Sequence, residues 1–473
     1  MLLLSFISKA SGTLVAIILA RILTPEDFGL VAVGILAVSL LQVFSEVGIK
    51  QALIKESEVD TEKMLDTAWT IEFIRGLIIF ILVFLNASFI AEFFNKSEAI
   101  NVIRILAFLP LIKSISSIKI IYLQKELEFK KQFIYEIAGL AGPLLITIPL
   151  ALILQNVWAI IIGTLSGEFI KMVASYFVMP YKPSLTFNKK YFFQMFRFGK
   201  WILLGSIVSY FAMELDTYVA AKFFDASLLG IYVLAFSLSN KPAVEISKVL
   251  GKILFPAFAK IGHDIKRTKK AYLKASYLLY LVLIPVSLGL SLIAEDFVMV
   301  VLGEKWESMI PAFQILSIGA LFRSLSVPSG GLFNGIGKPN LVFIQSTIRM
   351  IVLIIFIAYF YHNIGLITLS IAVLLSNIAF LTMFIIFLRK HIFLYLKDFI
   401  FNYLSLIIAA VAMCFAVIIV IFLLKPGIIR LTLSIFIGIA SYGGALILLN
   451  HTKRFNHLDD YIKPLLNSVK NED

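Results

Sequence analysis

Fourteen apolar runs, each about as long as a membrane-spanning helix, fill most of this 473-residue sequence. A helix needs roughly 20 mostly apolar residues to cross the hydrocarbon core of a bilayer. The runs lie at 1–23, 30–54, 67–93, 99–123, 133–154, 157–179, 201–224, 230–258, 272–293, 309–334, 340–361, 364–388, 400–424 and 427–450. Hydrophobic residues make up 60% of the chain and charged residues only 15%, a balance that suits lipid rather than water. We therefore predict an all-α integral membrane protein with about 14 transmembrane helices.

The basic residues between the runs indicate an orientation. When the amino terminus is placed inside, the segments on that side carry 24 Lys and Arg residues, and the opposite segments carry only Lys96, Lys305 and Lys425. Basic residues favour the cytoplasmic side of a membrane, so we expect both termini in the cytoplasm. The net charge of +13 then belongs to one membrane face, and we expect no nucleic-acid partner.

The sequence offers little for enzymatic chemistry. The segments between the runs are too short for a soluble catalytic domain, and the sequence holds no phosphate-binding loop and no nucleophile elbow. The five histidines lie between the runs or at their ends, at positions 263, 362, 391, 451 and 457. Cys414 is the single cysteine, so no intramolecular disulfide can form. We expect a protein that is not an enzyme and that holds no metal or cofactor.

The sequence contains an internal repeat. A shift of 201 residues places the phrase at 18–33 over the phrase at 218–234, and a shift of 210 places 104–116 over 314–326. Each copy holds an even number of spans, so the copies insert in the same orientation. This predicts two six-helix bundles related by a pseudo-twofold axis along the membrane normal, followed by two further helices.

The repeat divides the chain into four parts. We expect an N-terminal bundle at 1–179, a linker at 180–200, a C-terminal bundle at 201–388, and helices 13 and 14 with a cytoplasmic tail at 389–473. In the linker, the three phenylalanines at 192, 193 and 196 can face acyl chains while its basic residues reach headgroups. This pattern is typical of an amphipathic helix in the membrane interface.

Charged residues inside the apolar runs are costly, so each needs a partner or a polar cavity. Some have a partner within one helical turn, which allows neutralisation on a single helix face. These pairs are Glu46–Lys50, Glu72–Arg75, Glu168–Lys171 and Glu245–Lys248. We interpret them as structural.

Other charges lack such a partner and are candidate site residues. Lys113 and Arg323 occupy equivalent positions of the two copies, and Arg349 and Lys241 lie near the middle of their runs, although Lys241 could meet Glu245. A cleft lined by Lys and Arg favours an anion, and diphosphate oxygens match their donors. We predict that these four residues bind an anionic headgroup.

Two acidic residues lie within the seventh run. Glu214 and Asp216 cannot share one helix face at this spacing, so at least one should face the cleft or a cation. Intramembrane carboxylates can carry a coupling proton or Na⁺, and we propose that role for this pair.

Four phrases resemble a known family. They are "ILARILTPEDFGLVAV" at 18–33, "LDTYVAAKFFDASLLGIYVLAFSLSNKP" at 215–242, "GKILFPAFAKI" at 251–261 and "LGEKWESMIPAFQILSIGALFRSLS" at 302–326. The chain resembles the bacterial polysaccharide repeat-unit flippases, which handle O-antigen and exopolysaccharide units. These belong to the multidrug/oligosaccharidyl-lipid/polysaccharide exporter superfamily.

The resemblance implies a function. It implies a monomeric flippase in the bacterial cytoplasmic membrane that moves undecaprenyl-diphosphate-linked oligosaccharide to the outer leaflet by alternating access. Its partners would be this anionic lipid-linked oligosaccharide and the membrane lipids. Asp216 matches an Asp that the family often carries, whereas Thr217 stands where the family often has a basic residue. Lys9 is the one candidate for a cavity-facing cation in the first run.

Two alternatives belong to other classes. A cation-coupled multidrug antiporter on the same fold would favour an acidic cleft. A scaffold, glycosyltransferase or polymerase would need a large external loop or an acidic pair, and the external segments are short. We keep the antiporter as the alternative.

Overall fold

The computed structural model describes residues 2–46, 48–55, 58–126 and 128–450, and within these ranges the regular structure is helical, with no strand. Ten helices of the described chain are long and apolar enough to cross a membrane. The protein is therefore a multi-pass membrane protein, and the all-α expectation is confirmed.

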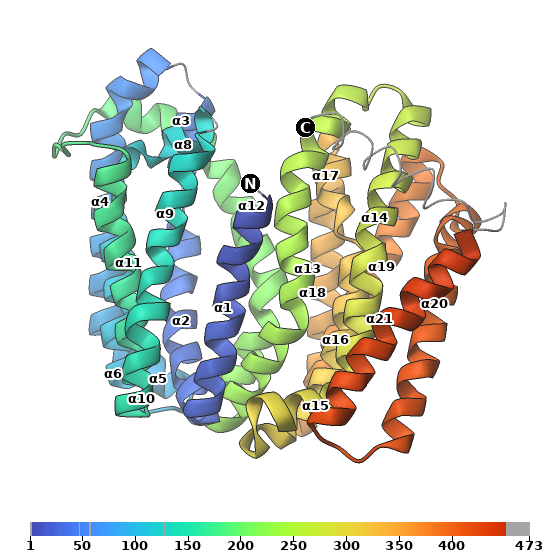
Figure 1. The fold of residues 1–473 in the computed structure, drawn as a ribbon. Helices are drawn as coiled ribbons and strands as arrows, with labels where there is room; N and C mark the ends of the chain where they lie inside the picture. The colour runs from blue at the N-terminus through green and yellow to red at the C-terminus, as the bar shows by residue number, and fades with distance from the viewer. Residues whose placement is uncertain (1, 47, 56–57, 127, 451–473) are drawn as a thin grey trace. The chain divides into compact units, whose positions relative to one another are not determined.

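The chain forms two compact units, Met1–Leu234 (unit 1) and Ala235–Asp473 (unit 2), each described here by itself. The helices that begin in unit 1 are α1 (Leu2–Ile22), α2 (Pro25–Ser45), α3 (Ile49–Lys55), α4 (Glu58–Leu85), α5 (Ala87–Phe93), α6 (Ala99–Leu106), α7 (Phe108–Ile115), α8 (Ile121–Lys125), α9 (Phe129–Ala141), α10 (Ile148–Leu154), α11 (Trp158–Val178), α12 (Lys189–Phe223) and α13 (Ala226–Ile261) (Figure 1). Those of unit 2 are α14 (Ile265–Leu292), α15 (Ala294–Asp296), α16 (Ile310–Leu325), α17 (Pro328–Gly335), α18 (Pro339–Tyr359), α19 (Leu366–Ile392), α20 (Leu396–Leu423) and α21 (Ile428–Asn450).

The repeated phrase forms two hairpins, α1–α2 and α12–α13. Thr24 caps α2 through a reciprocal box, because its hydroxyl accepts from the Asp27 amide at 3.3 Å and its amide donates to Asp27 Oδ2 at 2.9 Å. A methyl group on Gly29 would lie 1.8 Å from the carbonyl oxygen of Ala226, and one on Gly230 would lie 1.8 Å from that of Pro25. The two hairpins therefore meet backbone to backbone, and each glycine is required by the other copy.

A buried lysine fixes the turn beside these hairpins. Lys96 is only 2% exposed, and its ammonium donates to the carbonyl oxygens of Phe94, Ala221 and Phe224 at 3.0, 2.5 and 2.8 Å. These bonds satisfy carbonyls at the C-terminal end of α12, where a cation also suits the helix dipole. Burial lowers the pKa of the Lys96 ammonium.

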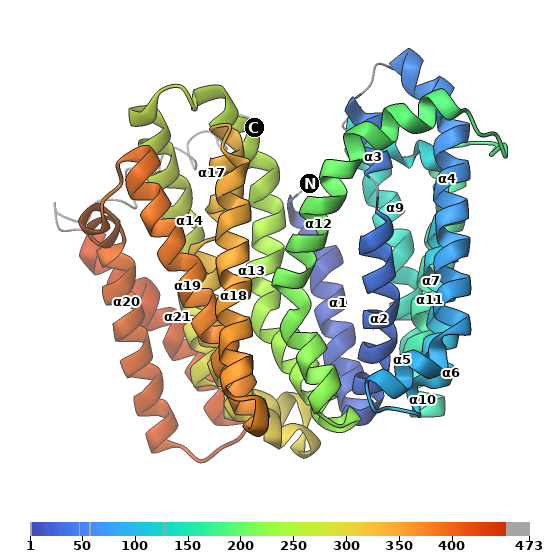
Figure 2. The same cartoon turned by 180° about the vertical axis from the view of Figure 1, so that it is seen from behind.

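One expected run and the expected linker take a different form. The run at 99–123 is interrupted after α7, because the Ser117 amide donates to Ser175 Oγ at 2.8 Å and its hydroxyl donates to the Met179 carbonyl at 2.8 Å. The linker at 180–200 contains an irregular segment and then the first turns of α12. The whole of α12 has 35 residues, from Lys189 to Phe223. At about 1.5 Å per residue this helix is longer than a bilayer core, and Figure 2 shows its first part running across one end of unit 1.

The irregular segment before α12 is held against α4. The Thr186 amide donates to Thr70 Oγ1 at 3.1 Å, and the Asn188 amide donates to Thr67 Oγ1 at 3.2 Å. Tyr181 Oη donates to Asp66 Oδ1 at 2.5 Å. Burial raises the pKa of Tyr181, and the Asp66 carboxylate raises it further.

In unit 2, α20 and α21 pack beside α14. Buried hydroxyls join the helices, because Ser276 Oγ lies 2.5 Å from Tyr403 Oη and Tyr277 Oη lies 3.2 Å from Ser405 Oγ. Tyr280 Oη donates to the Leu325 carbonyl on α16.

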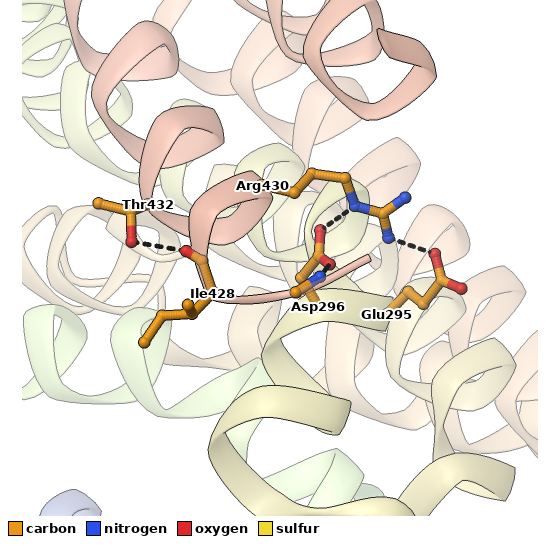
Figure 3. A network of polar contacts seen from close by, with 6 residues as sticks. Glu295, Asp296, Ile428, Arg430 and Thr432 are labelled. Carbon is orange, nitrogen blue, oxygen red and sulfur yellow. Dashed lines mark hydrogen bonds and ion pairs between the residues drawn. The ribbon is translucent and has the colours of Figure 1, made fainter. Parts of the chain in front are cut away.

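At the far end of this hairpin, Arg430 lies between two carboxylates (Figure 3). Its Nε is 2.6 Å from Asp296 Oδ2, and its Nη2 is 2.6 Å from Glu295 Oε2. Asp296 also accepts the Gly427 amide at 3.0 Å. The buried guanidinium thus ties α21 to α15.

Candidate functional site

Unit 1 contains a cavity of about 140 Å³ whose lining is rich in charge. Its walls come from the end of α2, the start of α3, and the middles or ends of α4 and α7. The residues that matter here are Glu46, Lys50, Glu72, Arg75, Gly76, Lys113 and Ser114. Three cations and two carboxylates therefore share one small space.

A glycine lets α4 and α7 approach closely enough to form this cavity. A methyl group on Gly76 would lie 2.3 Å from Ser114 Oγ and 2.7 Å from the Pro110 carbonyl oxygen. Ser114 Oγ donates to the Leu111 carbonyl at 2.7 Å, which satisfies the hydroxyl within its own helix. Because Arg75 and Lys113 adjoin these two contact residues in the sequence, the close approach brings both side chains to the same cavity.

Two ion pairs involve cations of this cavity, and they differ in distance and in exposure. Arg75 Nη2 lies 2.9 Å from Glu72 Oε2, and the Glu72 side chain is only 8% exposed. Lys113 Nζ lies 3.6 Å from Glu168 Oε1 on α11, and the Lys113 side chain is 48% exposed. Partly exposed, long ion pairs contribute little energy. Lys113 is therefore the cation that can exchange its carboxylate for an incoming anion most easily.

These pairs differ in part from the expected ones. Glu72–Arg75 forms as predicted. Glu168 and Lys171, which were expected to pair with each other, pair instead with Lys113 and with Glu136 Oε2, the latter at 2.8 Å. Lys113 lies in the last turn of α7 rather than in mid-span, and it has an acidic partner. The sequence could not reveal this partner because it lies on another helix.

The other predicted cations are distributed over both units. Arg323 Nη1 donates to Asn240 Oδ1 at 3.4 Å, and Lys241, the next residue on α13, is half-buried. Arg349 is buried on α18. All three belong to unit 2. Lys9 lies on α1 in unit 1, and its side chain falls outside the described part of the structure, as do those of Glu245 and Lys248 on α13.

The two acidic candidates lie on α12 in unit 1 and differ in environment. Asp216 is fully buried and accepts a hydrogen bond from Tyr232 Oη. Glu214 is half-buried. Nearby, Tyr210 Oη lies 2.6 Å from Ser39 Oγ and 2.9 Å from Tyr218 Oη, which forms a chain of hydroxyls between α12 and α2. The Asp216 carboxylate is thus bound by a phenolic donor from α13.

The polysaccharide biosynthesis protein family matches residues 18–311, which include all of the cavity described above. The chain belongs to this family. The family assignment expected from the four sequence phrases is thereby confirmed.

Two curated bacterial proteins are similar to this chain in sequence. The lipopolysaccharide biosynthesis protein WzxC of Escherichia coli (strain K12) is 28% identical over 337 residues, which cover 69% of this chain and 66% of the relative. The teichuronic acid biosynthesis protein TuaB of Bacillus subtilis (strain 168) is 27% identical over 307 residues, covering 64% and 63%. The match therefore spans just under two thirds of the length of each relative.

Solved structures share the fold. The lipid II flippase MurJ in an inward closed conformation superposes with a TM-score of 0.78 at 16% identity, covering 95% of this chain and 98% of MurJ. An inward-facing multidrug resistance transporter of the MATE family gives 0.65 at 16% identity, covering 83% and 94%. At these identities the likeness concerns the fold.

Sequence reasoning missed part of the cavity in this polysaccharide biosynthesis protein. Lys50, Arg75, Glu46 and Glu72 were set aside because each has a partner within one turn. The overlooked signal was that the Glu72–Arg75 pair adjoins Gly76, a small residue at which another helix can approach. The cavity combines residues from three parts of the chain, and only the packing brings them together.

Proposed function

We propose that this protein is a flippase that moves undecaprenyl-diphosphate-linked oligosaccharide repeat units from the cytoplasmic to the outer leaflet, for the biosynthesis of a surface polysaccharide. The observation that carries the proposal is the charged cavity of unit 1, where Lys50, Arg75 and Lys113 meet within a membrane protein of the polysaccharide biosynthesis family. Charged groups within a membrane protein mark substrate and ion pathways.

The cavity suits a diphosphate that binds and leaves. Arg and Lys donors match phosphate oxygens, while Glu72 and Glu168 neutralise Arg75 and Lys113 when no substrate is bound. An anion that displaces Glu168 from Lys113 replaces a loose ion pair with a closer contact. The Glu168 side chain is 28% exposed, so water can solvate the released carboxylate, and the exchange avoids the larger cost of an isolated buried ion.

The proposed architecture follows the sequence repeat. Fourteen spans would form pseudo-twofold-related bundles at 1–179 and 201–388, with the linker at 180–200 and two further helices and a tail at 389–473. The protein would be a monomer of the bacterial cytoplasmic membrane with both termini in the cytoplasm, and it would work by alternating access. Lys9, Lys241, Arg323 and Arg349 complete the proposed cationic path, and Glu214 or Asp216 would carry a coupling H⁺ or Na⁺.

One observation favours the alternative, a cation-coupled multidrug antiporter. The cavity contains Glu46 and Glu72 as well as the three cations, so its lining is mixed rather than purely basic. The chain also shares its fold with a MATE transporter. Carboxylates in an apolar unit can bind a cation, and transport assays with cationic drugs distinguish the two functions.

The test begins with deletion of the gene and identification of the lipid-linked glycan that accumulates in the cytoplasmic leaflet. Complementation with Lys113→Ala or Arg323→Ala should lower surface polysaccharide by at least about 30-fold, because each removes a charged contact to the headgroup. The measurement is surface polysaccharide per cell, corrected for the amount of protein in the membrane.

Lys131→Ala is the matched control. The Lys131 side chain is also 48% exposed and forms an ion pair of 3.5 Å with Glu128, but it lies outside the cavity. This variant should complement fully. Normal polysaccharide with Lys113→Ala and Arg323→Ala would remove both residues from the mechanism, and drug resistance without glycan accumulation in the deletion strain would favour the antiporter.

A further inference from the structure

Unit 2 has a groove of about 420 Å³ that the proposed transport path does not use. It lies between α14 and α20, near the residues where both helices begin. Lys269 and Leu273 line it from α14, and Lys397, Asp398, Phe401 and Asn402 line it from α20.

The groove has a basic end. Lys269 Nζ donates to Asp398 Oδ2 at 2.8 Å and to the Phe393 carbonyl oxygen at 3.1 Å. Lys397 is exposed beside this pair. The first turns of α14 and α20 add positive dipole ends. The positive charge of two lysines and two helix N-terminal ends therefore exceeds the negative charge of the single carboxylate in the groove.

The surroundings add further positive charge. α14 carries basic residues in its first turns, and α19 ends in basic residues just before α20. They are Lys266, Arg267, Lys270, Lys274, Arg389 and Lys390. Asp264, which caps α14 by accepting the Arg267 amide at 3.0 Å, is the nearby acidic residue besides Asp398 among the described residues of 261–274 and 389–402. This surface attracts anions and, by the distribution of basic residues, belongs to the cytoplasmic face.

The other end of the groove is apolar. Leu273 and Phe401 line it, and Phe401 is 45% exposed. Next to it, Leu396 and Ile400 are also exposed. A free phosphate would gain nothing from these side chains, whereas a lipid presents an anionic headgroup and an apolar glycerol–acyl region together. The two-sided lining therefore matches an amphiphile.

We propose that this groove binds one anionic phospholipid of the cytoplasmic leaflet, with Lys269 and Lys397 at its phosphate and Leu273 and Phe401 along its acyl region. The lipid phosphate competes with Asp398 for Lys269. The site thereby joins α14 to α20 through a membrane lipid, and it is separate from the charged cavity of unit 1.

The experiment measures thermal unfolding of the purified full-length chain in neutral detergent as phosphatidylglycerol is titrated. The wild type should gain stability with phosphatidylglycerol but not with phosphatidylcholine or inorganic phosphate, because binding to the folded state raises the unfolding midpoint. Lys397→Gln should raise the half-maximal lipid concentration about fivefold. Asp398→Asn should lower it about fivefold, because the side-chain amide oxygen can still accept from the Tyr395 backbone amide at the start of α20 but carries no charge to hold the Lys269 ammonium.

Lys190→Gln is the control for general surface charge. Lys190 is exposed at the start of α12 and lies outside the groove, so this variant should keep the wild-type titration. The proposal is overturned if phosphatidylglycerol does not stabilise the wild type, or if inorganic phosphate or phosphatidylcholine stabilises it equally. It is also overturned if Lys397→Gln and Lys190→Gln shift the titration alike, or if Asp398→Asn weakens binding.

Discussion

The helices α4 of unit 1 and α14 of unit 2 have the same length, 28 residues each. Their chemistry differs. Counted from the first residue of each helix, Glu72 and Gly76 of α4 correspond to Leu279 and Leu283 of α14, and Arg75 corresponds to Val282. Leu279 and Leu283 are buried in the apolar core that α14 forms with α20 and α21.

This difference teaches how two helices of equal length can serve two purposes. In unit 1, the close contact of α4 with α7 through Gly76 leaves a polar cavity. In unit 2, α20 and α21 pack beside α14, and hydroxyls and leucines fill the corresponding part of the helix. The added hairpin is therefore compatible with an apolar α14, and a charge at position 279 or 283 would be buried without a partner.

The largest expected effect comes from breaking the anchor of the added hairpin. Arg430→Ala leaves Asp296 and Glu295 without their guanidinium, and removal of one partner from a buried ion pair costs about 3–5 kcal/mol. We expect a marked loss of folded protein from detergent extracts, measured by the monodisperse fraction in size-exclusion chromatography. Arg267→Ala, which removes an exposed arginine 3.3 Å from Asp264, is the matched control. Equal yields of the two variants would show that the hairpin does not depend on this anchor.

A pair of alanine substitutions at corresponding positions tests the difference between the helices directly. Leu283→Ala opens a void in the core of unit 2 and should cost about 2–5 kcal/mol. Gly76→Ala inserts a methyl group against Ser114 Oγ and the Pro110 carbonyl, and overpacking of this kind costs about 1–3 kcal/mol.

Gly76→Ala and Leu283→Ala should differ in their effects on export and on thermal stability. Gly76→Ala should also impair polysaccharide export, because it separates α4 from α7 and widens the cavity, whereas Leu283→Ala should lower the unfolding temperature and leave export by the surviving protein intact. Export per membrane-inserted molecule, measured beside the unfolding midpoint, checks this. A larger export defect for Leu283→Ala than for Gly76→Ala would contradict the assignment of transport to the cavity.

The smallest effect is expected from Glu168→Gln. The ion pair with Lys113 is long and partly exposed, so its loss should change stability by about 0.2–1 kcal/mol. The variant frees Lys113 and should bind the lipid-linked diphosphate more tightly, which titration of the purified protein can measure. Glu128→Gln, which removes the partner of Lys131 outside the cavity, should leave that affinity unchanged.

The apolar runs in the sequence predicted several membrane-spanning helices with nearly the bounds that the structure shows. The runs at 157–179, 340–361 and 427–450 correspond closely to α11, α18 and α21, because apolar length is a property of the segment itself. The break after α7 could not be predicted, since Ser117 is held by Ser175 on α11 and by Met179, which caps that helix. The same reason limited the site: Lys113 was found as a charge within a run, but Glu168, its partner, required the packing of α7 against α11.

The contact of Gly29 with Ala226 and of Gly230 with Pro25 has a mechanical consequence. It joins main chain to main chain, so no rotamer change can relieve a displacement there. The first turn of α2 and the first turn of α13 are therefore held against each other without side chains between them, and neither can be displaced there without displacing the other. Each copy of the phrase supplies one of the two glycines, so neither copy could form this contact alone.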